Sequence, residues 1–274
     1  MVRLKFLLTR GILGRTRTLQ NQQAAVRTQS ISNTIWAVVP LKTPDAAKSR
    51  LQAGLGADTR RRLFFWMARR VIRTLARTPG IAGVSVVTAS PEVGAFAECE
   101  GATLIWEERE AGTAEACRSA VAHLSKRVDG VLMISGDIPL ISSEVVVELL
   151  RCQPPRRFAP PLLEKEGREN PVHLTPTPLV AIVPDRRRSG TNALLCTPPA
   201  IVPPSFGKDS FQRHLAAARS QGLDVRIVES DVLALDIDEL EDLDELQRRI
   251  EAHPALLSAE LREALPRRAE APAQ

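Results

Sequence analysis

The chain of 274 residues contains no tyrosine, and aromatic residues make up only 4% of it. Proteins that bind single-stranded nucleic acid usually stack its bases on aromatic side chains, so we expect no nucleic-acid partner. No apolar run approaches the roughly 18 consecutive residues of a membrane-spanning helix. We therefore expect a protein that does not enter a membrane.

Cysteine is also scarce. The four cysteines are far apart and form no Cys-x-x-Cys pair, which argues against a disulfide framework or a zinc site and favours a reduced, cytoplasmic setting. The net charge of +5 comes mostly from arginines spread along predicted helices. That pattern favours a solvated surface over a phosphate-binding patch. Apolar content of 44% and charged content of 25% are ordinary for a globular protein.

Three segments differ in composition from the rest. Residues 1–32 carry six Lys or Arg and no acid, as a transit peptide does, although we favour a disordered basic tail or an upstream alternative start. Residues 151–178 are rich in proline and charge and predict an exposed loop insertion. Residues 253–274 predict a C-terminal helix and tail. The folded domain is therefore expected to span 33–252.

Within that domain, apolar runs of strand length alternate with segments of helical periodicity. Strands that alternate with helices form a largely parallel sheet with right-handed crossovers, so we expect an α/β fold with helices flanking the sheet. Asp58 or Thr59 is expected to cap the first long helix. The expected strands are 35–39, 83–88, 102–106, 131–134, 179–184, 191–195 and 225–229. The expected helices are 58–77, 92–99, 112–126, 142–150, 206–220 and 240–251.

The strand at 131–134 leads into a Ser-Gly-Asp-Ile-Pro segment, 135–139. Its continuous apolar character predicts burial on both faces of the sheet. Gly136 permits a close backbone approach or an unusual φ, and Pro139 ends any strand pairing. Asp137 is therefore expected just beyond the carboxyl end of a central strand, where open α/β sheets bind ligands. The alternative is that Asp137 only shapes the turn or caps the next helix.

Three basic residues, Lys42, Lys48 and Arg50, follow the first strand within a dozen residues. The Gly-x-x-x-x-Gly-Lys pattern is absent, so this is not a Walker loop. Together with backbone N–H groups, the three side chains could still surround a polyphosphate. The alternative is an exposed basic loop without a ligand.

Two aspartates, Asp236 and Asp238, stand two residues apart near the end of the domain. In an extended segment such residues point to the same side, and two adjacent carboxylates repel unless a cation lies between them. Oxygen ligands without a nearby histidine or cysteine favour Mg²⁺ over zinc. The alternative role of Asp238 is to cap the helix 240–251. Further upstream, Gly207 and Ser210 at a helix amino end predict an anion-binding cradle.

With these residues in place, the chain resembles the CofC/FbiD family, the guanylyltransferases of coenzyme F420 biosynthesis. The similarity covers about residues 34–250 and rests on motifs that occur in family order. The pairing of Gly-Thr-Asn-Ala-Leu-Leu with Phe-Gly-x-x-Ser-Phe separates this family from sugar nucleotidyltransferases. The motifs are VPLK at 39–42, AKSRL at 47–51, SGDIP at 135–139, GTNALL at 190–195, FGKDSF at 206–211 and DID at 236–238.

The resemblance implies a single-domain, Rossmann-like nucleotidyltransferase fold of the GT-A-like kind, with a mixed, mostly parallel sheet. It implies transfer of GMP from GTP to 2-phospho-L-lactate, phosphoenolpyruvate or 3-phospho-D-glycerate, with Mg²⁺ as cofactor and release of pyrophosphate. Asp137, Asp236 and Asp238 would hold the metal. The implied catalytic residues are Lys42, Lys48 and Asp137. The implied GTP-binding residues are Leu41, Lys42, Lys48, Arg50, Thr88 and Gly112. The implied acceptor-binding residues are Thr191, Gly207 and Ser210.

The sequence departs from the family pattern at Gly112-Thr113-Ala114, where the family usually has Gly-Leu-Asn. Two other functions compete with the implied one. The first is a sugar-1-phosphate or molybdopterin-type nucleotidyltransferase, against which the missing Gly-Gly-x-Ser-x-Arg loop argues. The second is a nucleotide-binding module without catalysis, which Ala114 would permit, although such a module has little use for three converging carboxylates.

Overall fold

The computed structural model describes residues 34–44, 48–151, 178–254 and 261, all within one compact unit. The leader at 1–32, nearly all of the 151–178 insertion and most of the 253–274 tail lie outside the described residues. The predicted domain boundaries therefore stay predictions. None of the described helices is both long and apolar enough to cross a membrane.

The described strands form one seven-stranded sheet in the order β3-β2-β1-β4-β6-β5-β7. β6 runs antiparallel to both of its neighbours, β4 and β5, and the other pairings are parallel. The expected mixed, mostly parallel sheet is confirmed. The strands are β1 (Ile35–Pro40), β2 (Ile81–Thr88), β3 (Thr103–Trp106), β4 (Gly130–Ile134), β5 (Leu179–Pro184), β6 (Thr191–Thr197) and β7 (Val225–Ile227).

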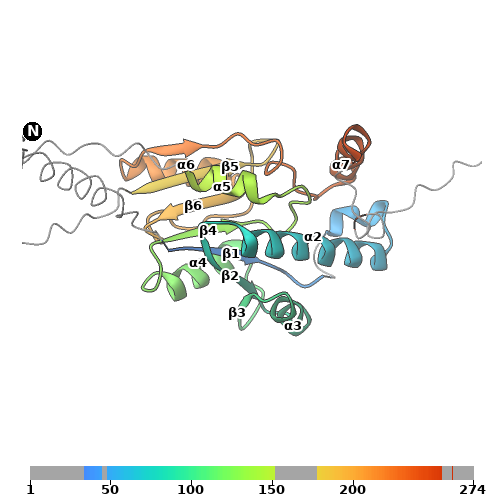
Figure 1. The fold of residues 1–274 in the computed structure, drawn as a ribbon, viewed down its shortest axis with the longest axis horizontal. Coiled ribbons are helices and arrows are strands. Elements are labelled where there is room, and N and C mark those ends of the chain that lie inside the picture. The colour runs from blue at the N-terminus through green and yellow to red at the C-terminus, as the bar shows by residue number, and fades with distance from the viewer. Residues whose placement is uncertain (1–33, 45–47, 152–177, 255–260, 262–274) are drawn as a thin grey trace, which may run out of the picture. The chain divides into compact units, whose positions relative to one another are not determined.

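Helices cover both faces of the sheet (Figure 1). One apolar cluster joins the sheet to α2, α3 and α5, and a second joins its other face to α4 and α6. Burial on both faces explains why β4 and β5 are apolar almost throughout and why β6 is apolar in its middle, 193–196. The helices are α2 (Ala57–Arg77), α3 (Pro91–Cys99), α4 (Thr113–Leu124), α5 (Ser143–Arg151), α6 (Ser210–Ser220) and α7 (Leu240–Ala252).

Two local predictions were wrong. Helix α2 is preceded by Gly56 at its N-cap, so Asp58 lies within the first turn, where its charge complements the positive end of the helix dipole. Residues 49–53 were expected in a loop but form a short 3₁₀ helix, η1 (Ser49–Ala53). Leu51 is fully buried, and burying this side chain accounts for the compact turn.

A third apolar cluster lies between η1, the first half of α2 and α7, and α7 sits beside that end of α2 in Figure 1. Leu235 and Ile237, in the segment before α7, are fully buried in this cluster. They alternate with Asp236 and Asp238. Because successive residues of an extended chain point to opposite sides, anchoring the two apolar side chains turns both carboxylates the other way.

Replacing Ile237 with Ala should therefore destabilise the fold. We expect the free energy of unfolding to fall by about 2–5 kcal/mol, because the change leaves a cavity in a fully buried position. Urea unfolding followed by circular dichroism measures this loss. Ile227→Ala removes the same atoms from a side chain that is 36% exposed and serves as the matched control. Equal losses in the two variants would contradict the anchoring role of Ile237.

Candidate active site

A cavity of about 730 Å³ opens where the parallel strands β1 and β4 end. Its walls come from the segments that follow β1 and β4, the turn between β5 and β6, and the first residues of β6 and α6. Because β6 is antiparallel, its first residues lie at the same sheet edge as the last residues of β4. The cavity therefore occupies the edge at which open α/β sheets bind ligands.

Asp137 stands three residues beyond the end of β4 and is held by a hydrogen bond. Ser135 Oγ donates to Asp137 Oδ1 at 2.6 Å. Between them, Gly136 lies so close to the loop after β1 that a Cβ atom would stand 2.4 Å from Leu41 Cδ2. A larger residue would displace Leu41, which also lines the cavity. The close approach expected at Gly136 is thus confirmed.

Lys48 is the central cation of the site. Its backbone adopts a left-handed conformation with φ of 60°, which is uncommon for residues other than glycine. The side chain is only 6% exposed, and its ammonium group donates to the carboxylate of Asp137 and to Asp238 Oδ1, the latter at 2.9 Å. Burial opposes the charged form, but the two carboxylates outweigh it and raise the pKa of Lys48. The ammonium is therefore charged and bridges two segments.

Asp236 and Asp238 experience opposite electrostatic environments. Burial, reinforced by the charges of Asp137 and Asp238, raises the pKa of Asp236 to about 7. Its Oδ1 accepts from Asn192 Nδ2 at 3.2 Å. Burial also disfavours the charge of Asp238, but the neighbouring Lys48 ammonium lowers its pKa below the usual value. The site thus has more carboxylate charge than Lys48 alone compensates.

The three aspartates offer oxygen ligands only, the donor set that Mg²⁺ prefers. In the described part of the chain, no three acidic, histidine or cysteine side chains are grouped as a metal site. Lys48 instead occupies the position between Asp137 and Asp238. Asp137 and Asp238 therefore already accommodate a positive charge, and the raised pKa of Asp236 indicates that further positive charge would be favourable there.

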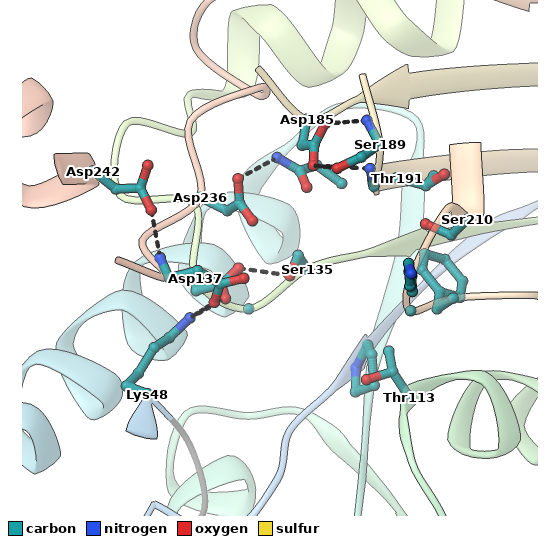
Figure 2. Close-up of a pocket in the computed structure, with 18 of the residues that line it drawn as sticks. Lys48, Thr113, Ser135, Asp137, Asp185, Ser189, Thr191, Ser210, Asp236 and Asp242 are labelled. Atoms are coloured by element: carbon teal, nitrogen blue, oxygen red, sulfur yellow. Dashed lines mark hydrogen bonds and ion pairs between the residues drawn. The ribbon is translucent and has the colours of Figure 1, made fainter. Parts of the chain in front are cut away.

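A second group of predicted residues lies across the cavity from Lys48. Figure 2 shows Thr191 and Ser210 on the side away from Lys48 and Asp137. Gly207, with φ of 110°, precedes Ser210, the first residue of α6, and all three residues line the cavity. The N–H groups of Ser210 and Phe211 already donate to Gly207 O and Ser189 O at 3.1 and 3.3 Å. The positive end of the helix dipole still favours an anion, so this side is suited to a carboxylate or phosphate.

The remaining predicted residues have different positions. Lys42 and Arg50 are exposed and line the cavity, and Arg50 Nη1 pairs with Glu239 Oε1 at 3.2 Å. Gly112 is the N-cap of α4, and its neighbour Thr113 lines the cavity. Thr88 is fully buried at the end of β2, where its Oγ1 accepts from Ser90 N at 3.1 Å. Thr88 is not part of the cavity wall.

The structure adds a basic turn that sequence reasoning did not assign to the site. The carboxylate of Asp185 accepts from the backbone N–H groups of Ser189 and Gly190, each at 2.8 Å. This turn places Arg186 and Arg187 on the cavity wall. An aspartate that precedes Ser-Gly in a short connection is a recognisable turn signal, but it gives no indication that the arginines face a cavity.

The capping of α7 excludes one of the two roles considered for Asp238. Glu239 is the N-cap residue, and Asp242 completes a capping box. Asp242 Oδ2 accepts from the N–H groups of Asp238 and Glu239 at 3.0 and 2.8 Å, while Oδ1 accepts from Arg186 at 2.5 Å. Asp238 is therefore not the cap, and its carboxylate is directed to Lys48.

Comparisons with known proteins agree with this architecture. The MobA-like NTP transferase domain family matches residues 66–273. Two solved structures share the fold: a protein from Desulfovibrio desulfuricans G20 assigned to the nucleotide-diphospho-sugar transferases (TM-score 0.60, 16% identity, covering 83% of this chain and 92% of that one), and a nucleotidyl transferase from Methanothermobacter thermautotrophicus (TM-score 0.55, 15% identity, covering 80% and 99%). The fold and family together define a nucleotidyltransferase.

Curated proteins with higher sequence identity to this chain identify a smaller group within the family. A phosphoenolpyruvate guanylyltransferase of Conexibacter woesei is 38% identical over 216 residues, covering 78% of this chain and 88% of the relative. The enzyme of the same name from Rubrobacter xylanophilus is 37% identical over 213 residues, covering 78% and 93%. The chain therefore belongs to the MobA-like NTP transferases and, within them, to the CofC/FbiD guanylyltransferase family.

A buried histidine beside the cavity generates a prediction about stability. Burial, together with the charge of Arg213, lowers the pKa of His214 to about 4, whereas an unfolded histidine titrates near 6.5. A lowered histidine pKa stabilises the fold above about pH 6.5, and this contribution is lost as the pH falls toward 4. As the pH falls through this range, the unfolding free energy of the wild type should decrease by up to about 3 kcal/mol because His214 becomes protonated.

His214→Gln removes the group whose pKa differs between the folded and unfolded states. The unfolding free energy of this variant should therefore fall less between pH 7 and pH 4 than that of the wild type. Urea unfolding at both pH values measures the difference. His123→Gln, at an exposed position, controls for the removal of a histidine as such. A variant at position 214 that keeps the full wild-type pH dependence would contradict the prediction.

Proposed function

We propose that this protein transfers GMP from GTP to the phosphate of a small phosphorylated three-carbon acid, with release of pyrophosphate. Phosphoenolpyruvate is the first candidate acceptor, because the relatives most similar among those described carry that substrate in their names. The alternatives are 2-phospho-L-lactate and 3-phospho-D-glycerate. The product would carry a guanosine diphosphate group on the acid, as an intermediate of coenzyme F420 biosynthesis.

The reaction exchanges one phosphoanhydride bond for another. An oxygen of the acceptor phosphate attacks the α-phosphorus of GTP, and the bond from that phosphorus to the oxygen bridging to the β-phosphate breaks. The electron pair leaves with pyrophosphate. The attacking phosphate is already ionised at neutral pH, so no general base is needed. Because two anions must approach each other, positioning and charge neutralisation supply most of the catalysis.

One observation carries this proposal: the buried ammonium of Lys48 lies between Asp137 and Asp238 on the wall of a nucleotidyltransferase cavity. Lys48 would neutralise phosphate charge in this cavity, and Lys42, on the same wall, would add to it. Asp137, Asp236 and Asp238 would hold Mg²⁺, which when bound would neutralise phosphate charge. Their oxygen-only side chains and the raised pKa of Asp236 suit that ion.

The two ends of the cavity would then hold different substrates. GTP would bind along the segment that follows β1, with Leu41 beside the nucleotide and Lys42, Lys48 and Arg50 toward its phosphates. Gly112, at the start of α4, would approach the nucleotide through its backbone. The acceptor's carboxylate would bind on the opposite wall, which consists of the residues Thr191, Gly207 and Ser210.

The acceptor is tested by measuring pyrophosphate release with GTP and Mg²⁺ against each of the three acids in turn. We expect turnover with phosphoenolpyruvate and a value of kcat/KM at least about tenfold lower with the other two, which differ from it in the groups around the phosphate and carboxylate. ATP in place of GTP is the control for the nucleotide. No release with any acid would overturn the proposed function.

Replacing Asp137 with Asn should abolish most of the activity while leaving the fold intact. The change removes one charge that holds Lys48 and one proposed metal ligand, so we expect kcat to fall at least about a hundredfold. Pyrophosphate release measures the rate, and circular dichroism checks the fold. Asp224→Asn, at an exposed position outside the cavity wall, is the matched control. Wild-type turnover by the Asp137 variant would remove this residue from the mechanism.

A further inference from the structure

His214 lies on α6 beside the acceptor wall, and its side chain is fully buried. One ring nitrogen, Nδ1, is 3.0 Å from Thr191 Oγ1. The other, Nε2, is 2.8 Å from the backbone nitrogen of Ser205. The ring also packs edge to face on Phe206, with 5.0 Å between centroids. His214 therefore connects the first residue of β6 to the loop that leads into Gly207.

The partners of the ring determine where its proton lies. A backbone N–H can only donate, so Nε2 must accept from Ser205. A neutral imidazole has one donor and one acceptor, which leaves the proton on Nδ1. Burial and the charge of Arg213 lower the pKa of His214 to about 4, and the ring is accordingly neutral at pH 7. Nδ1–H then donates to Thr191 Oγ1.

The direction of the hydrogen bond from His214 determines whether the Thr191 hydroxyl can donate to a ligand. A hydroxyl group has one proton and two lone pairs, and here one lone pair accepts from His214. The hydroxyl proton must therefore go to a different partner, and Thr191 lines the cavity. With the opposite tautomer, Thr191 would donate to His214 and present only lone pairs to the cavity, which would repel an anion.

We propose that His214 is a positioning residue that keeps the Thr191 hydroxyl oriented as a hydrogen-bond donor toward the carboxylate of the acceptor. The inference rests on the proposed function for the identity of the ligand. Its structural part, the tautomer of His214, does not depend on that function. His214 also holds Ser205, two residues before Gly207, and thereby links two parts of the acceptor wall.

The tautomer is measured directly by nitrogen-15 NMR of the full-length protein at pH 7. The chain has four histidines, and the signal of His214 is assigned from its disappearance in His214→Gln. We expect the Nδ1-protonated neutral tautomer. An Nε2-protonated ring, or a doubly protonated ring, would overturn the proposal even if the enzyme is fully active.

Two variants separate the two hydrogen bonds of the ring. In His214→Gln the amide oxygen can replace Nε2 as acceptor for Ser205, but the donor to Thr191 is lost. In His214→Asn the amide N–H can replace Nδ1–H as the donor to Thr191. We expect His214→Gln to raise the KM for the acceptor about tenfold, with the KM for GTP nearly unchanged, and His214→Asn to recover most of this loss.

The role of Thr191 as the mediator is tested by a double-mutant cycle. Thr191→Val removes the hydroxyl, so adding His214→Gln should cause little further increase in the KM for the acceptor. If the two changes raise the KM for the acceptor independently, His214 does not act through Thr191. An equal increase in the KM for the acceptor and the KM for GTP would show the same. If the wild type releases no pyrophosphate with any acid, the proposed function fails, while the NMR result still decides the orientation of Thr191.

Discussion

The buried ammonium of Lys48 is the interaction on which the site depends. It joins the loop after β1 to Asp137 after β4 and to Asp238 before α7, residues that are far apart along the chain. A buried charge is tolerated only when it is paired and hydrogen-bonded, so the positions of the three segments depend on one another. A buried pair contributes little net stability. We therefore regard the pairing of Lys48 with the two aspartates as a means of positioning charge rather than of stabilising the fold.

The antiparallel strand β6 supplies the other half of the cavity. In a fully parallel sheet, the first residues of this strand would lie at the edge opposite to the ends of β1 and β4. The short turn after β5 reverses the chain, so Thr191 and Asn192 reach the same edge as Asp137. The two halves differ in character: Lys48 and the aspartates provide the charged groups, while Thr191, Ser210 and the positive end of the α6 dipole suit an anion.

Local sequence patterns predicted much of the fold and of the aspartate side of the cavity. The burial of 131–134, the position of Asp137 beyond it and the shared direction of Asp236 and Asp238 follow from local periodicity and turn residues. Thr88 was placed by resemblance alone, and the structure buries it outside the cavity wall. His214 and the arginines after Asp185 could not be assigned to the site, because their orientation depends on partners distant in the sequence.

The sequence by itself determined the α/β class, the order of strands and helices, and the residue types available for chemistry, since periodicity, glycine and proline act over a few residues. Only the tertiary structure decided which of these residues meet. The left-handed backbone of Lys48, the capping of α7 by Glu239 and Asp242 and the hydrogen bond between His214 and Thr191 each depend on packing between segments. A local sequence pattern cannot predict such contacts. They form only when segments that are distant in the chain pack together and bury the residues between them.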